Sequence, residues 1–196
     1  MGGNATPTPS TTISMANINS ALGNSAGTTI SFNNADVRFL SNQDSGSVSM
    51  SNMRNKFYGF ASGTVEYGES WDKSTHYQYY GFYPSVGIFN ASNANAFFTQ
   101  VVNGVIDRNI LYADASNNYP TPYFPSNMGS SYTFRLKITH AGSSTIYVQN
   151  TPAGYWSITS DQWYFELNQY SDPAHVANWF PAAWTGSAVT VQIAST

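Results

Sequence analysis

The chain has 196 residues, which is enough for one medium domain or for a small module joined to a larger one. Because 41% of the residues are hydrophobic, 16% are aromatic and only 9% are charged, the composition predicts a folded protein and excludes a charged, disordered tail. Seven basic and ten acidic residues give a formal net charge of −3, so nucleic acid is not an expected partner.

Cysteine and long apolar segments are both missing from the sequence. Zero cysteines exclude disulfide bonds, thiolate metal sites and cysteine nucleophiles. No apolar run approaches the ~18 residues of a membrane-spanning helix. Residues 1–7 lack the basic and apolar regions of a secretory signal. We therefore expect no membrane span, and we expect lysis or an assembly to carry the protein if it leaves a cell.

The N-terminal stretch is rich in Gly, Thr, Pro and Ser. Pro7 and Pro9 favour an extended backbone in this stretch. Residues 1–12 are therefore predicted to form an extended arm that becomes ordered on a partner.

Residues 13–56 contain a weak internal repeat, in which a β-branched residue is followed by Ser and a large apolar residue. The copies start at Ile13, Ile30 and Val48, about every 17–18 residues. In each copy a Ser or Asn side chain is placed to accept a free amide of a helix's first turn. The repeat predicts three short helices, and Gly23 is expected to end the first one in a left-handed conformation.

The three predicted helices each have an apolar face that needs a partner. Helices of about two turns are not stable alone, and a module of about 45 residues has a marginal core. We therefore predict a small helical docking module over residues 13–56. The apolar residues expected to form its assembly interface are Ile13, Met15, Ile18, Leu22, Val37, Leu40, Met50 and Met53.

From Phe57 onward, aromatic and β-branched residues alternate with clusters of Gly, Pro, Asn and Ser. This pattern predicts a mainly β domain over residues 57–196, folded as an antiparallel β-sandwich or jelly-roll-like domain. The predicted strands cover residues 77–83, 106–112, 133–139, 156–158, 162–167 and 188–193. Residues 120–129 and 172–186 are predicted to be long surface loops.

The clearest predicted strand is 133–139, because its apolar and polar residues alternate. Leu136 and Ile138 are expected to face the core, whereas Arg135 and Lys137 are expected to face solvent. The small residues at 141–144 then predict a hairpin turn.

Catalytic and metal-binding patterns are weak in this sequence. The segment 68–72 has the first Gly and the Ser of a nucleophile elbow but Asp72 in place of the second Gly. The three histidines lie far apart and have no acidic partner at metal-ligand spacing. Glu66 and Glu69 have an odd separation, which places them on opposite faces of a strand. We therefore expect a non-enzymatic protein without catalytic residues, metal or cofactor. A carboxylate pair assembled across strands would leave a glycan hydrolase open.

Aromatic residues are the richest chemical feature of the β domain. Most are expected in its core, because a β domain of this size needs large apolar side chains. Tyr123, Trp179 and Trp184 lie on Pro-flanked loops and are predicted to be exposed. Since Tyr and Trp rings stack on sugars, these three residues are candidate contacts for a host surface glycan.

Three segments together resemble a known module. They are 13–23, with Ile13-Ser14-Met15 and Leu22-Gly23, then 30–38, and then 45–56, with Val48-Ser49-Met50-Ser51. In this order and spacing they resemble a module near the starts of tailed-bacteriophage virion proteins, many of which are labelled tail or tail-fibre proteins. The family's usual Leu-Arg-Gly-Lys ending is here Met53-Arg54-Asn55-Lys56. Asn55 tolerates a left-handed backbone nearly as well as Gly.

The resemblance covers about a quarter of the chain and implies a function. It implies a non-enzymatic virion structural protein, tail-associated as a tail fibre or a baseplate or adaptor component, whose module attaches the β domain to the particle. The expected partners are other virion proteins and further copies of this chain, with a trimer favoured. Two alternatives stay open: a capsid decoration or cement protein, and a host-glycan-binding domain.

Overall fold

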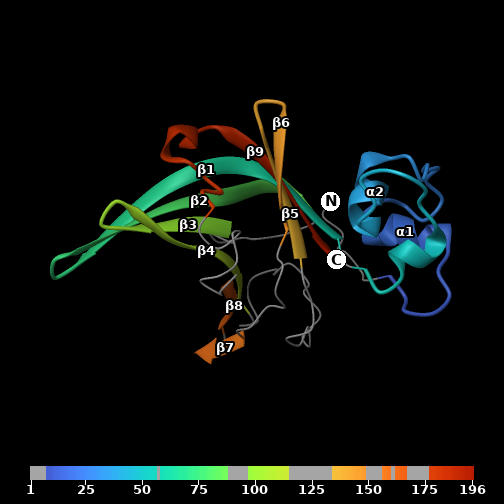
Figure 1. Ribbon diagram of the computed structural model, residues 1–196, viewed down its shortest axis with the longest axis horizontal. Coiled ribbons are helices and arrows are strands. Elements are labelled where there is room, and N and C mark those ends of the chain that lie inside the picture. The colour runs from blue at the N-terminus through green and yellow to red at the C-terminus, as the bar shows by residue number, and fades with distance from the viewer. Residues whose placement is uncertain are drawn as a thin grey trace.

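The structure is a computed structural model. It describes residues 8–56, 58–87, 97–114, 134–148, 156–159, 162–166 and 177–196. Within these residues, the end of the arm (residues 8–12) and a small N-terminal module (residues 13–56) lie beside one end of a curled antiparallel sheet (Figure 1). The prediction of a mainly β chain preceded by short helices is confirmed. The predicted contact Tyr123 and the loop 120–129 lie outside the described residues.

The first two predicted helices are present as α1 (Met15–Ala21) and α2 (Ala35–Ser41). Each begins where a polar side chain accepts a free backbone amide. Ser14 Oγ accepts from the amide of Asn17 at 3.3 Å, and Asn34 Oδ1 accepts from the amide of Asp36 at 2.8 Å. The sequence-based prediction of both helix starts is therefore confirmed.

Both helices end in a left-handed residue. Gly23 has φ of 75° after α1, and Asn42 has φ of 57° after α2. This conformation turns the next amide back onto the last helical turn, where Asn24 donates to the carbonyl of Asn19 at 2.8 Å. Gln43 makes the same contact with the carbonyl of Arg38 at 3.0 Å. The predicted role of Gly23 is confirmed.

The third predicted helix is only a single 3₁₀ turn, η1 (Met50–Met53). Its start nevertheless repeats that of α1. The amide of Ser49 donates to Asn52 Oδ1 at 2.8 Å, as the amide of Ser14 donates to Asn17 Oδ1 at 2.9 Å. Asn55 follows with φ of 52°, the left-handed backbone expected of it. The weak sequence repeat thus reflects a shared local structure.

The arm contacts the module at its C-terminal end. The amide of Thr8 donates to the carbonyl of Lys56 at 2.9 Å, and the amide of Asn55 donates to the carbonyl of Pro9 at 3.0 Å. Thr8 is only 3% exposed. Residues 8–9 therefore contact the end of the module within this chain.

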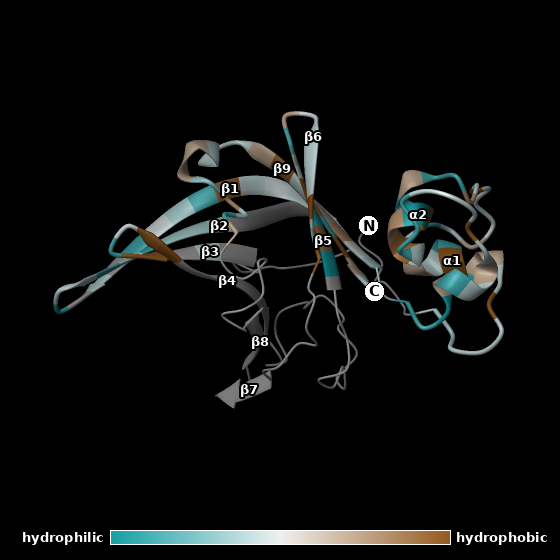
Figure 2. Cartoon of the chain, in the orientation of Figure 1, coloured by the Kyte–Doolittle hydropathy of each residue, from teal (hydrophilic) through white to brown (hydrophobic). Residues whose placement is uncertain are grey.

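The core of the module is shared with the sheet. Its buried members come from both parts of the chain: Ile13, Ile18, Ala21, Val37, Phe39, Leu40, Met53, Tyr58 and Ala194. Figure 2 shows hydrophobic segments in both helices and in the neighbouring strands of the sheet. Because Tyr58 and Ala194 belong to the β domain, the module packs on its own chain.

Nine described strands form one sheet in the order β6-β5-β9-β1-β2-β3-β4-β8-β7, and each pairing is antiparallel. Their bounds are β1 Tyr58–Asp72, β2 Thr75–Gly87, β3 Phe97–Val102, β4 Val105–Asp114, β5 Phe134–His140, β6 Ser143–Val148, β7 Trp156–Thr159, β8 Gln162–Glu166 and β9 Ala188–Ser195. A 3₁₀ turn, η2 (Ala182–Trp184), precedes β9. All six predicted strands are present, and β6 is the second strand of the hairpin predicted around residues 141–144, whereas β1 and β3 were not predicted. Closure of the curled sheet into a sandwich or jelly roll stays a prediction.

One face of β5 differs from its predicted environment. Leu136 and Ile138 are buried as expected, but Arg135 is also buried, with only 1% of its surface exposed. The prediction that Arg135 faces solvent is therefore wrong. The alternation in β5 correctly separates the two faces, but the N-terminal module covers the face that carries Arg135.

Among the described helices, none is long and apolar enough to span a membrane.

A polar contact beside this core predicts an alkaline sensitivity. Gln192 Nε2 donates to Tyr58 Oη and to Asp36 Oδ1, both at 2.7 Å. Burial, and then the neighbouring Asp36 carboxylate, raise the pKa of Tyr58 above its ordinary value of 10.0. The folded protein thus holds this proton at a pH at which the unfolded chain has lost it.

We expect the free energy of unfolding to fall by about 1.4 kcal/mol per pH unit above pH 10 because of Tyr58. The Tyr58 contribution is fully present below pH 10 and is lost as the pH rises toward the raised pKa of the folded state. In Tyr58→Phe this part of the slope should be absent. Urea unfolding at pH 7, 10 and 11 measures the difference, and parallel declines in both proteins would contradict it.

Candidate functional site

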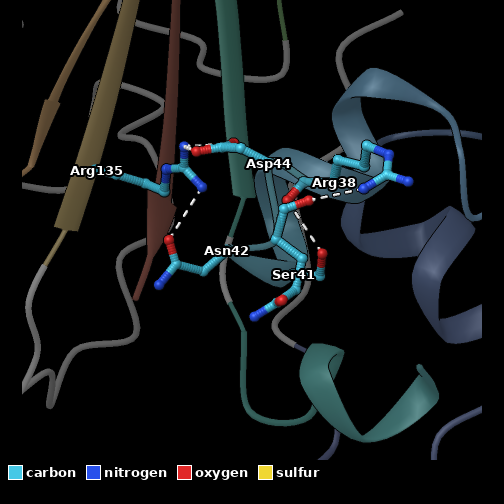
Figure 3. A network of polar contacts seen from close by, with 6 residues as sticks. Arg38, Ser41, Asn42, Asp44 and Arg135 are labelled. Carbon is cyan, nitrogen blue, oxygen red and sulfur yellow. Dashed lines mark hydrogen bonds and ion pairs between the residues drawn. The ribbon is translucent and has the colours of Figure 1, made fainter. Parts of the chain in front are cut away.

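The module–sheet junction, formed by Phe39, Asn42, Asp44 and Arg135, is centred on a buried guanidinium. Arg135 Nη2 donates to both carboxylate oxygens of Asp44 at 2.7 Å, and Nη1 donates to Asn42 Oδ1 at 3.0 Å (Figure 3). The guanidinium carbon lies 4.6 Å from the centre of the Phe39 ring. These contacts hold the end of α2 against β5.

The Asp44 loop is itself held by α2. Arg38 Nη2 donates to Asn33 Oδ1 at 2.8 Å and to the carbonyl of Gly46 at 3.1 Å, and Nη1 donates to the carbonyl of Gln43 at 3.2 Å. The backbone on either side of Asp44 is therefore held to α2 by contacts that do not involve Arg135. The Asp44 loop therefore contacts both α2 and β5.

The second region is a set of side chains at the end of the β1–β2 hairpin, which we call the hairpin platform. Its residues are directly opposite pairs across the two strands: Tyr67 and Tyr80, Glu69 and Gln78, Trp71 and His76. Since successive side chains alternate between the faces of a strand, all six lie on one face.

The rings of the hairpin platform stack on one another. The Trp71 and His76 rings are 4.0 Å apart between centroids and nearly parallel, with an interplanar angle of 5°. The Tyr67 and Tyr80 rings are 5.3 Å apart and tilted by 38°. Cross-strand ring contacts restrict the rotamers of both partners, so the aromatic faces are held in place.

Polar contacts link the two ring pairs through Glu69. Its Oε2 accepts a hydrogen bond from the Tyr67 hydroxyl and lies 3.2 Å from His76 Nε2. Gln78 Nε2 donates to the Tyr67 hydroxyl at 3.4 Å. The Tyr67 hydroxyl, and then His76, lower the pKa of Glu69 below its usual range, so the carboxylate is charged at neutral pH. Among the described residues, no partner is seen for Oε1 of Glu69.

The hairpin platform is exposed and lies far from the module. Trp71 is 66% exposed and Tyr67 is 43% exposed, although both rings are large. The hairpin turns at Lys73, which has φ of 54°, at the opposite end of the molecule from α1 and α2 (Figure 1). Exposed, ordered aromatic rings of this kind are typical of binding surfaces rather than of cores.

The predicted interface residues mostly lie inside the chain's own core. Ile13, Ile18, Val37, Leu40 and Met53 are buried there, and Leu22 and Met50 pack against it partly buried. Met15 is the exception, with 36% of its surface exposed. The buried side chains form the core of the module, and Met15 is the member of the predicted set that is open to solvent.

Of the predicted glycan contacts, Trp179 is not exposed. It is only 1% exposed and lies 6.0 Å from the Tyr147 ring, so the prediction of its exposure is wrong. Trp184 is half-buried, and its ring stacks on His140 at 4.2 Å. A Pro-flanked loop predicts a surface path for the backbone but does not predict where a large side chain points.

Sequence reasoning missed the hairpin platform. The alternations Tyr67, Glu69, Trp71 and His76, Gln78, Tyr80 on either side of a short turn are the signal that predicts one shared face. Residues 68–72, whose sequence resembles part of a hydrolase elbow, lie within β1 and carry Glu69 and Trp71 of the platform. The spacing in the sequence indicates no acidic partner for His76. In the hairpin, however, the pairing of β1 with β2 brings Glu69 Oε2 to 3.2 Å from His76 Nε2.

The acidic and histidine side chains of the described residues can be compared with the groupings that catalysis uses. No group of three or more His, Asp or Glu side chains among them could hold a metal ion. A glycosidase requires two carboxyl groups that face each other. Glu69 instead pairs with the imidazole of His76. The hairpin platform offers flat apolar rings beside charged and amide groups, an arrangement suited to binding.

Comparisons with protein-family models, with curated proteins and with solved structures found no match for this chain. Its function is therefore inferred from the side chains of the hairpin platform and from the module–sheet junction.

Proposed function

We propose that this chain is a non-enzymatic structural protein of a tailed-bacteriophage virion, associated with the tail as part of a fibre or of a baseplate or adaptor. In this role the N-terminal module attaches the β domain to the particle. The observation that carries the proposal is the separation along the molecule: the module lies at one end and the exposed hairpin platform at the other (Figure 1). The resemblance of residues 13–56 to phage virion proteins supports the same role.

The junction suits an attachment role because it fixes the sheet relative to the module. Arg135 joins β5 to the Asp44 loop, and Gln192 joins β9 to Asp36 in α2. A module that is clamped in this way holds the β domain at a set angle to the surface on which it docks. The exposed surface around Met15 would meet the neighbouring virion protein.

We further propose that the chain assembles as a trimer and that the curled sheet closes into a sandwich or jelly-roll-like domain. The support for assembly comes from β6, an edge strand of the described sheet, where Ile146 is 41% and Val148 is 46% exposed. Exposed apolar side chains on an edge strand are normally covered by a partner or replaced by charges.

Light scattering tests the assembly. The wild-type chain should have the mass of three copies, and Ile146→Lys should reduce it to the mass of one. Thr145→Lys is the matched control, because Thr145 is exposed on the other face of the same strand and should leave the mass unchanged. A monomeric wild-type chain would contradict the trimer.

Immunogold electron microscopy of purified tailed particles tests the virion assignment. Antibodies against the purified chain should label the tail. Label confined to the head would favour the capsid decoration alternative over the tail assignment. Unlabelled particles, with the chain also missing from their mass spectra, would overturn the virion role.

A further inference from the structure

We propose that the hairpin platform binds a neutral carbohydrate, with a pyranose ring stacked on the solvent-facing side of Trp71. This inference goes beyond the attachment role, because it assigns a ligand class to the end of the molecule opposite the module. It stands on the platform residues alone and does not require the virion assignment.

Trp71 supplies the stacking surface. One side of its indole is covered by the parallel His76 ring at 4.0 Å, while 66% of the residue stays exposed. A flat, apolar indole face matches the C–H face of a pyranose ring. Because the stack with His76 already fixes the ring, binding a sugar costs little further side-chain entropy.

Tyr67 extends the aromatic surface along the strand. It lies four residues before Trp71 on the same face and is 43% exposed. Its hydroxyl is held by Glu69 and Gln78, which leaves the ring as the accessible part. Two exposed rings on one face, four residues apart on a strand, fit an oligosaccharide better than a single monosaccharide.

Glu69 supplies the polar recognition. Oε2 is occupied by Tyr67 and His76, but Oε1 has no partner among the described residues and half of the side chain is exposed, at 52%. A fixed carboxylate oxygen beside an indole can accept a hydrogen bond from a sugar hydroxyl, and charge-assisted bonds of this type are the stronger ones. Its negative charge disfavours acidic sugars, so the expected ligand is neutral.

A protein partner is the less favoured occupant. The apolar centres of protein interfaces are depleted of Glu and other charged residues, whereas Glu69 lies at the middle of this surface between the two ring pairs. A second copy of this chain remains a defined outcome of the test, because an exposed Trp is also common at interfaces between subunits.

The test is a glycan array probed with the full-length chain, followed by tryptophan fluorescence titration with the strongest neutral oligosaccharide. Wild type should bind neutral structures in preference to acidic ones. Trp71→Ala should weaken binding by at least about tenfold, the scale of an aromatic anchor lost from a binding site. Glu69→Gln should also weaken it, because it keeps the shape but loses the charge.

Glu66→Gln is the matched control, since Glu66 lies on the opposite face of the same strand and should leave binding unchanged. Unaltered thermal unfolding of Trp71→Ala would show that the loss is not a folding defect. The proposal is overturned if wild type binds no neutral sugar, or if Trp71→Ala binds as well as wild type. It is equally overturned if Trp71→Ala changes the mass in solution while sugar binding persists. None of these results bears on particle labelling, so failure here is distinct from failure of the virion role.

Discussion

Replacing Asp44 with alanine is expected to lower the free energy of unfolding by about 2–4 kcal/mol, although its carboxylate is 65% exposed. The reason lies with its partner. Arg135 is 1% exposed and donates to both carboxylate oxygens of Asp44, so the variant leaves a buried guanidinium without its counter-charge. The value is below the 3–5 kcal/mol of a fully buried pair because water reaches the Asp44 side. Urea unfolding at neutral pH measures it.

Replacing Arg135, the other partner of this ion pair, should lower the free energy of unfolding by less. In Arg135→Met the apolar chain fills the space over Phe39, while Asp44 gains solvent and no buried charge remains. We expect a loss under about 1.5 kcal/mol, as for shape-conserving core changes. Glu66→Ala, which removes an exposed carboxylate elsewhere, should stay within about 0.5 kcal/mol of wild type. A larger loss in Arg135→Met than in Asp44→Ala would show that the ion pair itself is a net stabiliser.

Local signals in the sequence predicted the parts of the fold that local physics determines. Ser14 and Asn34 were placed at helix starts and Gly23 at a helix end, because capping depends only on residues within one turn. Strand β1 was missed because glycines at 59, 63 and 68 interrupt its pattern. Its 15 residues are held as a strand by pairing with β2 on one side and β9 on the other, and these contacts are invisible in a sequence window.

The two sites depend on such long-range contacts to different degrees. Arg135 and Asp44 are 91 residues apart in the sequence, so alternation could place Arg135 on a face but not reveal what covers it. The hairpin platform is local by comparison, because Trp71 and His76 flank one short turn. Once the turn is placed at Lys73, the residue pairs across β1 and β2 follow by counting outward from the turn. The platform was therefore predictable in principle.

Replacing Leu40 with alanine is expected to cost about 2–5 kcal/mol, because Leu40 is 0% exposed and its removal leaves a cavity in a core built from both parts of the chain. If this core belongs to one chain, the loss must be the same at every protein concentration, since only assembly makes stability depend on concentration. Unfolding curves at low and high protein concentration measure this. A loss that grows on dilution would mean that the module's core is shared between copies.

Met15→Ala is the matched variant for that experiment. Met15 lies on α1 but is 36% exposed, so the isolated chain should keep its stability within about 0.5 kcal/mol. If the module docks through this surface, Met15→Ala should instead reduce incorporation of the chain into particles. Leu40 and Met15 were both predicted to contact a neighbour, and burial now separates them. The first should act through folding, and the second should act through attachment.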